Sequence, residues 1–224
     1  MLRRAALLAA VFATTIVVTV PAAASYLVVR SSGPSARSYP LGMKLSDDAK
    51  VGLGAGDSLT VVGRTTARHL EGPGTFLVGG REHVRARASR RSRFGARRGR
   101  SLPDTPWMLD VTRSAQVCVS TEHQLYLWRR TEDHQSAATL TVQDGRSQTL
   151  TWPTGVSAIP WPSQFPLKEG YKYQVQLSDR REPTQLSIII VPAVGPQLAA
   201  TAKALIDRGC NAQLDILVDH ALAL

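Results

Sequence analysis

The segment TLTVQDGRSQTLTW, residues 139–152, is the clearest secondary-structure signal in the chain. Two runs rich in Thr, Leu and Val flank the dipeptide Asp144-Gly145. Asp-Gly supplies the positive φ values that a tight type I′ turn requires, and β-branched residues favour strands. The segment therefore predicts an antiparallel β-hairpin, with strands at 139–142 and 147–152.

Further strand patterns lie on both sides of this hairpin. Residues 171–177 alternate apolar and polar side chains, which is typical of a half-buried strand. Residues 186–191 are continuously apolar except for Ser187 and predict an interior strand. Short strands separated by Gly/Pro turns are predicted upstream, at 26–30, 50–53, 58–62, 67–70, 75–78, 107–111, 116–120 and 123–128.

The last thirty residues are helical in pattern. Pro196 suits the first position of a helix, and Gly209 suits its end. Apolar residues recur at helical spacing on either side of Gly209, at Leu198, Ala202, Leu205 and Ile206 and then at Leu214, Leu217, Val218 and Leu222. We expect a mainly β fold of two small sandwich- or barrel-like modules, joined by an Arg-rich linker and followed by a helical hairpin. The expected units are a signal peptide at 1–24, modules at 25–78 and 104–192, the linker at 79–103 and the hairpin at 193–224.

The first residues have the pattern of a secretory signal peptide. Arg3 and Arg4 precede an uncharged apolar run at 5–20, and Pro21 and three alanines follow. We predict cleavage after Ala24 and a periplasmic or secreted product. The alternative is an uncleaved membrane anchor, because no charge occurs between Arg4 and Arg30 and about 20 apolar residues span a bilayer. No later segment has that character, so no integral span is expected after cleavage.

The chain has two cysteines, Cys118 and Cys210, both downstream of the predicted signal. An even count in an oxidising compartment predicts one disulfide bond. Two separate buried thiols are the alternative, because unpaired cysteine is often fully buried.

The positive charge of the chain is concentrated in one segment. The formal net charge is +10, and residues 81–100 contribute +8, with nine arginines against Glu82. These side chains could bind phosphates or carboxylates, as in lipid head groups or lipopolysaccharide, or could simply keep a disordered linker soluble. Export makes nucleic acid an unexpected partner. The predicted anion-binding residues are Arg85, Arg87, Arg90, Arg91, Arg93, Arg97, Arg98 and Arg100.

Two parts of the chain resemble exported proteobacterial β proteins loosely related to the FecR-type periplasmic domain. The first is AGDSLTV at 55–61 with LEGPGTF at 70–76, and the second is LDVTRS at 109–114 with GCNAQLD at 209–215. The resemblance implies a periplasmic β scaffold. FecR-type proteins carry a transmembrane helix and an anti-sigma segment, neither of which follows the predicted signal here. The resemblance therefore carries over no signalling mechanism and no site residue.

Catalytic and metal-binding motifs are not found. The glycine-rich run at 52–57 precedes another strand pattern and lacks the Walker lysine, so it predicts a turn rather than a phosphate loop. The histidines and cysteines lack zinc-ligand spacing, and no Gly-x-Ser-x-Gly elbow occurs. We expect no catalytic residue, no metal and no cofactor.

One aromatic cluster leaves two interpretations open. Trp152, Trp161 and Phe165, each followed by proline, could form a platform for carbohydrate or peptidoglycan, or could pack inside a sandwich. The sequence favours a noncatalytic envelope interaction or scaffold protein whose partner is another envelope protein or an anionic membrane surface. The alternative is an envelope enzyme or binding protein that acts near this cluster, where Asp144 and Glu169 are the nearest acids.

Overall fold

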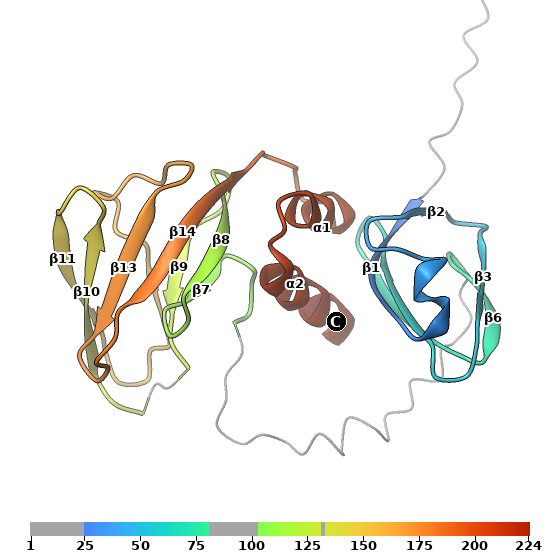
Figure 1. The fold of residues 1–224 in the computed structure, drawn as a ribbon, viewed down its shortest axis with the longest axis horizontal. Coiled ribbons are helices and arrows are strands. Elements are labelled where there is room, and N and C mark those ends of the chain that lie inside the picture. The colour runs from blue at the N-terminus through green and yellow to red at the C-terminus, as the bar shows by residue number, and fades with distance from the viewer. Residues whose placement is uncertain (1–24, 81–102, 131–132) are drawn as a thin grey trace, which may run out of the picture.

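A computed structural model describes residues 25–80, 103–130 and 133–224 of the chain. The fold is mainly β, with two C-terminal helices, and within the described residues no sheet closes into a barrel. Figure 1 shows two β modules with the two helices between them. The predicted fold class is confirmed. The predicted signal peptide and almost all of the predicted linker lie outside the described residues.

The N-terminal module contains a four-stranded sheet in the order β2-β1-β4-β5 and a two-stranded sheet of β3 and β6. All of its pairings are antiparallel. Val28, Leu59 and Val61 point between the sheets into a core of their own. The bounds are β1 Ser25–Ser32, η1 Pro34–Arg37, β2 Lys44–Ser46, β3 Lys50–Leu53, β4 Ser58–Val62, β5 Ala67–Glu71 and β6 Gly74–Leu77.

The second module is a sandwich of a five-stranded sheet, in the order β11-β10-β13-β14-β8, and a three-stranded sheet, β12-β9-β7. β14 pairs parallel with β8, and β7 pairs parallel with β9. Leu127 of the smaller sheet and Leu140 and Ile188 of the larger one share a single buried core. The bounds are β7 Met108–Asp110, β8 Ala115–Ser120, β9 Tyr126–Trp128, β10 Ser136–Val142, β11 Ser147–Trp152, β12 Ala158–Pro160, β13 Lys172–Leu177 and β14 Thr184–Val191.

The hairpin at 139–152 forms as predicted, but its turn differs from the prediction. Only Gly145 takes a positive φ, of 88°, and no described non-glycine residue does. A type I′ turn needs positive φ at both central residues, so that assignment was wrong. Gly145 N donates to Val142 O, and Val142 N donates to Arg146 O, which is typical of a type I turn followed by a glycine bulge. Asp144 stabilises this turn by accepting from the backbone N–H of Arg146 at 3.1 Å.

The two helices are α1, Leu198–Asp207, and α2, Asn211–Ala223. Pro196 lies before α1 instead of at its first position, a shift within the scatter of helix boundaries. Gly209 ends the first helix with a φ of 71°, as predicted. None of the described helices has the length and apolar character that a membrane crossing requires.

The helical hairpin contacts the N-terminal module as well as the second one. α1 packs against β1 and β4, and α2 packs against β5. Leu27 and Val29 of β1 therefore face the helices, while Val28 between them faces the interior of its own module. This arrangement explains why β1 is buried on both faces. One continuous apolar cluster runs from the second module through the hairpin to the outer face of β1.

The glycine-rich run at 52–57 is a turn between β3 and β4, as predicted, and Asp57 is its organising residue. The side chain of Asp57 is almost fully buried. Its carboxylate accepts from Gly54 N at 2.6 Å, from Ser35 N at 3.3 Å and from the Ser35 hydroxyl. These bonds, the one from the Ser35 hydroxyl above all, hold the pKa of Asp57 below its usual value.

The lowered pKa of Asp57 predicts a pH-dependent contribution to stability. Because the folded-state pKa lies below the unfolded value of about 3.9, the contribution is present above that pH and is lost as the pH falls through the folded-state pKa. We expect Asp57→Asn to lower the melting temperature at pH 7, with the gap from the wild type narrowing below about pH 4. Thermal unfolding followed by circular dichroism, from pH 7 to below about pH 4, measures this difference in melting temperature. Asp179→Asn at an exposed turn is the control, and a pH-independent gap for Asp57→Asn would contradict the assignment.

Candidate functional site

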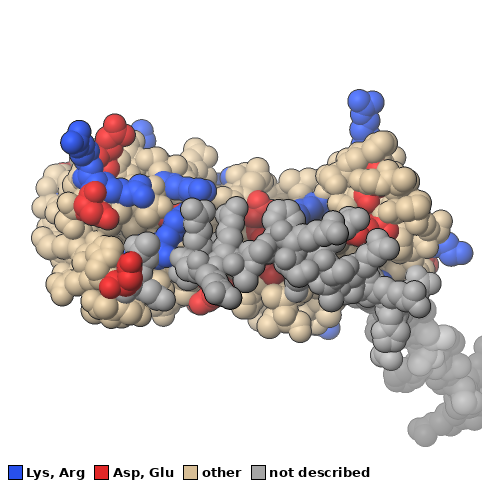
Figure 2. All heavy atoms as spheres, turned by 90° about the horizontal axis from the view of Figure 1, so that it is seen from below, with Lys and Arg blue, Asp and Glu red and all other residues tan. Residues whose placement is uncertain are grey.

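The predicted anion-binding segment, including Arg85, Arg87, Arg90, Arg91, Arg93, Arg97, Arg98 and Arg100, lies outside the described residues. The chain on either side of it is close to neutral. Residues 25–80 contain six basic and four acidic residues, and residues 103–224 contain ten basic and twelve acidic ones. On the face seen in Figure 2, blue and red side chains are interspersed over the two modules. The excess positive charge of the chain after residue 24 therefore resides in its arginine segment.

The aromatic cluster is part of the core, which favours the packing interpretation over the ligand platform. The exposed fractions of Trp152, Trp161 and Phe165 are 0%, 7% and 4%. Trp161 Nε1 donates to Phe165 O at 2.8 Å, and the Trp161 ring meets the Tyr173 ring edge-on with centroids 4.8 Å apart. These rings present almost no surface to a ligand because they fill the interior of the sandwich.

The two acids nearest to this cluster in sequence are engaged in structural contacts. Asp144 forms an ion pair with Arg146 at 2.8 Å, across the β10–β11 turn. Glu169 accepts from Ile190 N at 2.5 Å and lies 3.6 Å from the guanidinium of Arg208. Neither contact joins two carboxyl groups, whereas glycoside hydrolysis uses a pair of carboxyl groups.

One serine and one histidine lie close together, at the turn after β8. Ser120 Oγ and His123 Nδ1 are 3.3 Å apart, and the His123 ring stacks on Trp107. Ser120 is 4% exposed, and its hydroxyl also accepts from Glu122 N. No carboxylate of the described residues binds His123, so the third member of a catalytic triad is missing there. Among the described residues, no cluster of three or more metal-ligating side chains occurs.

Arg129 is a buried cation that joins two loop segments, the one before β10 and the one between β11 and β12. It is 3% exposed, and its guanidinium donates to the carbonyls of His134 at 2.7 Å, Pro153 at 3.2 Å and Val156 at 3.2 Å. Within the described residues its Nη1 has no hydrogen-bond partner. Sequence patterns do not predict this role, because the partners are backbone carbonyls, which any residue could supply.

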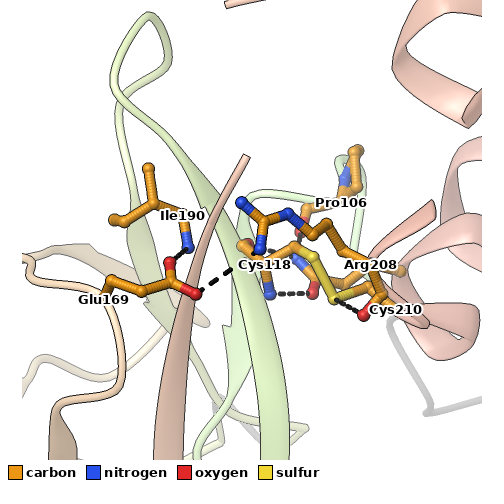
Figure 3. Close-up of a disulfide and its surroundings, with 7 residues drawn as sticks. Pro106, Cys118, Glu169, Ile190, Arg208 and Cys210 are labelled. Atoms are coloured by element: carbon orange, nitrogen blue, oxygen red, sulfur yellow. Dashed lines mark hydrogen bonds and ion pairs between the residues drawn. A yellow bond between two sulfur atoms is a disulfide. The ribbon is translucent and has the colours of Figure 1, made fainter. Parts of the chain in front are cut away.

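The helical hairpin is attached to both modules by several long-range contacts, and we call this region the joint. Cys118 of β8 and Cys210, between α1 and α2, form the predicted disulfide bond (Figure 3). Cys118 is fully buried and Cys210 is 4% exposed. In the same view Glu169 reaches Ile190 on one side and Arg208, at the end of α1, on the other. The disulfide and the Glu169–Arg208 ion pair both attach the bend of the hairpin to the second module.

Gln213 adds a third attachment, which sequence reasoning missed. Its side-chain oxygen accepts from Cys118 N at 2.6 Å, and its amide nitrogen donates to Cys118 O at 2.8 Å and Pro106 O at 2.7 Å. β8 is an edge strand, and the Gln213 amide satisfies the outward N–H and C=O of Cys118 as a neighbouring strand would. The only sequence signal is the position of Gln213, three residues after Cys210.

The contacts with the N-terminal module are noncovalent. Arg30 of β1 binds Asp215 at 2.8 Å and Asp219 at 2.6 Å, both on α2. Partial burial by itself would lower the pKa of Arg30, but the bonds to Asp219 and Asp215 together outweigh this effect, so the pKa is raised above its ordinary value. The first helical N–H groups of α1 are also satisfied by this module, because Leu198 N and Ala199 N donate to the carbonyls of the turn after β4. The hairpin thus attaches both modules, one through a disulfide and one through ion pairs and backbone bonds.

No protein-family model matches the chain, and none of the curated proteins compared with it matches either.

Proposed function

We propose that this chain is an exported, noncatalytic interaction protein of the cell envelope whose arginine segment, 81–100, binds anionic lipid or lipopolysaccharide. The observation that carries the proposal is the charge distribution: +8 in twenty residues, between parts with net charges of +2 and −2. Arginine binds phosphate oxygens in a bidentate manner, and each basic residue near an anionic surface contributes about 1 kcal/mol to binding.

The architecture supports a scaffold role for the rest of the chain. The candidate catalytic acids and the aromatic rings have structural contacts, and the joint fastens the two modules on which the arginine segment ends. A scaffold of this kind would hold the two modules that flank the basic segment in a fixed arrangement, and the FecR-like resemblance is compatible with that role. The carbohydrate-site alternative is not proposed, because its aromatic rings are buried.

Vesicle binding tests the proposal. A variant with all nine arginines of 81–100 replaced by glutamine should bind phosphatidylglycerol vesicles at least about 100-fold more weakly than the wild type, because nine favourable charge contacts are lost. Binding by the wild type should also fall as salt is raised. Cosedimentation measures both effects, and phosphatidylcholine vesicles serve as the uncharged reference.

Two control variants separate the segment from the overall charge. Arg37→Gln with Arg64→Gln removes two exposed arginines of the N-terminal module and should leave binding nearly unchanged. Replacing the nine arginines by lysine shows how much of the binding depends on guanidinium geometry rather than on charge. Equal vesicle binding by the wild type and the nine-glutamine variant would overturn the proposal.

A further inference from the structure

The outer edge of β11 is the starting point. β11 ends the five-stranded sheet and, among the described residues, pairs only with β10, in an unbroken register from Thr141↔Ser147 to Ser136↔Trp152. In Figure 1 it lies at the far left of the molecule, on the side away from the helices, and no labelled element lies beyond it. A sheet edge of this kind presents a row of unpaired N–H and C=O groups.

The other long edge strands of the described residues are covered. The edge of β8 is occupied by the Gln213 amide and the disulfide at Cys118. β5 packs against α2, and its Arg68 guanidinium donates to the carbonyls of Leu77 and Val78, at the end of β6. The edge strand beside the hairpin, β8, and the edge strand β5 of the N-terminal module are therefore both covered by other parts of the chain.

The remaining edge strands of the described part are short or carry residues that discourage pairing. β2, β7 and β12 have three residues each and contain Lys44, Asp110 and Pro160 respectively. β3 and β6 form a two-stranded sheet and have four residues each, and β3 begins with Lys50. Charges, prolines and short length are the common means of blocking edge-to-edge association. β11 has six residues, no charge, no proline and no bulge.

The sequence of β11 is compatible with pairing to itself. Ser147, Thr149 and Thr151 are exposed on the outer face, whereas Leu150 and Trp152 face the core. In an antiparallel pair, residues directly opposite each other lie on the same face, so a two-fold pairing centred on the middle of β11 places Thr149 opposite Ser147, Thr149 or Thr151. Within β11, each of these registers places only Ser and Thr opposite each other on the outer face, a favourable combination in which no like charges meet.

We propose that β11 pairs antiparallel with β11 of a second copy of this chain, which joins the two five-stranded sheets across a two-fold axis. The second copy is the favoured occupant because a two-fold contact places each exposed side chain of β11 opposite the same residue, or a near neighbour of it, in the other copy. These side chains are uncharged Ser and Thr, so they do not repel each other. The contact is small, so we expect a weak, concentration-dependent dimer. The inference is independent of lipid binding and involves no residue of the arginine segment.

Sedimentation of the purified protein in the absence of lipid tests the proposal. The wild type should approach twice the monomer mass as its concentration rises to about 1 mM. Thr149→Lys combined with Thr151→Lys should weaken dimerisation at least about 10-fold, because the lysines of the two copies face each other across adjacent strands. Thr139→Lys with Thr141→Lys places the same charges one strand further in, on β10. The β10 strands of the two copies would be about 14 Å apart, beyond the screening length for charges, so the dimer of this variant should persist.

Each outcome decides the proposal, provided that circular dichroism shows all variants folded. Dimerisation by the wild type and the β10 variant, with loss in the β11 variant, supports the edge contact. A wild type that stays monomeric at about 1 mM overturns it. Equal dimerisation by the β11 variant also overturns it, because another surface would then be responsible. Binding of an extended peptide by a monomeric protein would identify a different occupant of the edge.

Discussion

Replacing Cys118 and Cys210 together by alanine will lower the free energy of unfolding by about 4 kcal/mol. The disulfide joins residues 92 positions apart, and a cross-link over a loop of this length removes that much chain entropy from the unfolded state. Both side chains are buried, and alanine fills nearly the same space. Urea unfolding of the oxidised wild type and the double variant measures the difference.

A matched control for this prediction is chemical reduction. Reductant should destabilise the wild type by a similar amount and leave the double-alanine variant unchanged, since that variant has no cross-link to lose. Equal urea midpoints for the oxidised wild type and the variant would show that the attachment of the hairpin depends on Gln213 and Glu169 alone.

Trp152→Ala is expected to cost about 3–5 kcal/mol of stability, the range for deletion of a large buried aromatic side chain. Trp152 has no exposed surface, and its Nε1 donates to Leu127 O at 3.3 Å, between the two sheets of the sandwich. Urea unfolding monitored by far-ultraviolet circular dichroism measures the loss. Tyr171→Ala, at a half-buried ring beside Lys168, is the control and should cost much less. A loss below about 1 kcal/mol for Trp152→Ala would contradict the burial of this ring between the sheets.

Local patterns predicted most of the strands and both helices. The alternation at 171–177 and the apolar run at 186–191 depend on burial of one or two faces, and both segments form the expected strands, β13 and β14. β2 and β12 were not predicted. Each has only three residues, too few for an alternating pattern, and β12 ends in Pro160. The turn type was also wrong, because Asp-Gly fits both a type I′ turn and a type I turn followed by a glycine bulge.

The joint could be predicted only through its cysteines. The expected disulfide forms, but the partners of Arg30 and Gln213 lie 185 and 95 positions away in the chain. Nothing in the neighbourhood of either residue indicates such a partner. The role of the aromatic cluster could not be predicted either, because Trp and Phe before proline are compatible with a packed core as well as with a binding platform. Only their burial in the folded chain separates the two interpretations.

The claim on which the functional account depends is export, because export sets the compartment in which the arginine segment meets its partner. Intact-mass spectrometry of the protein recovered from its native cells, before and after reduction, tests this claim most directly. The account predicts a chain that begins at Ser25 and gains two hydrogens on reduction, as Cys118 and Cys210 are released. A chain that begins at Met1 and carries two free thiols would contradict it.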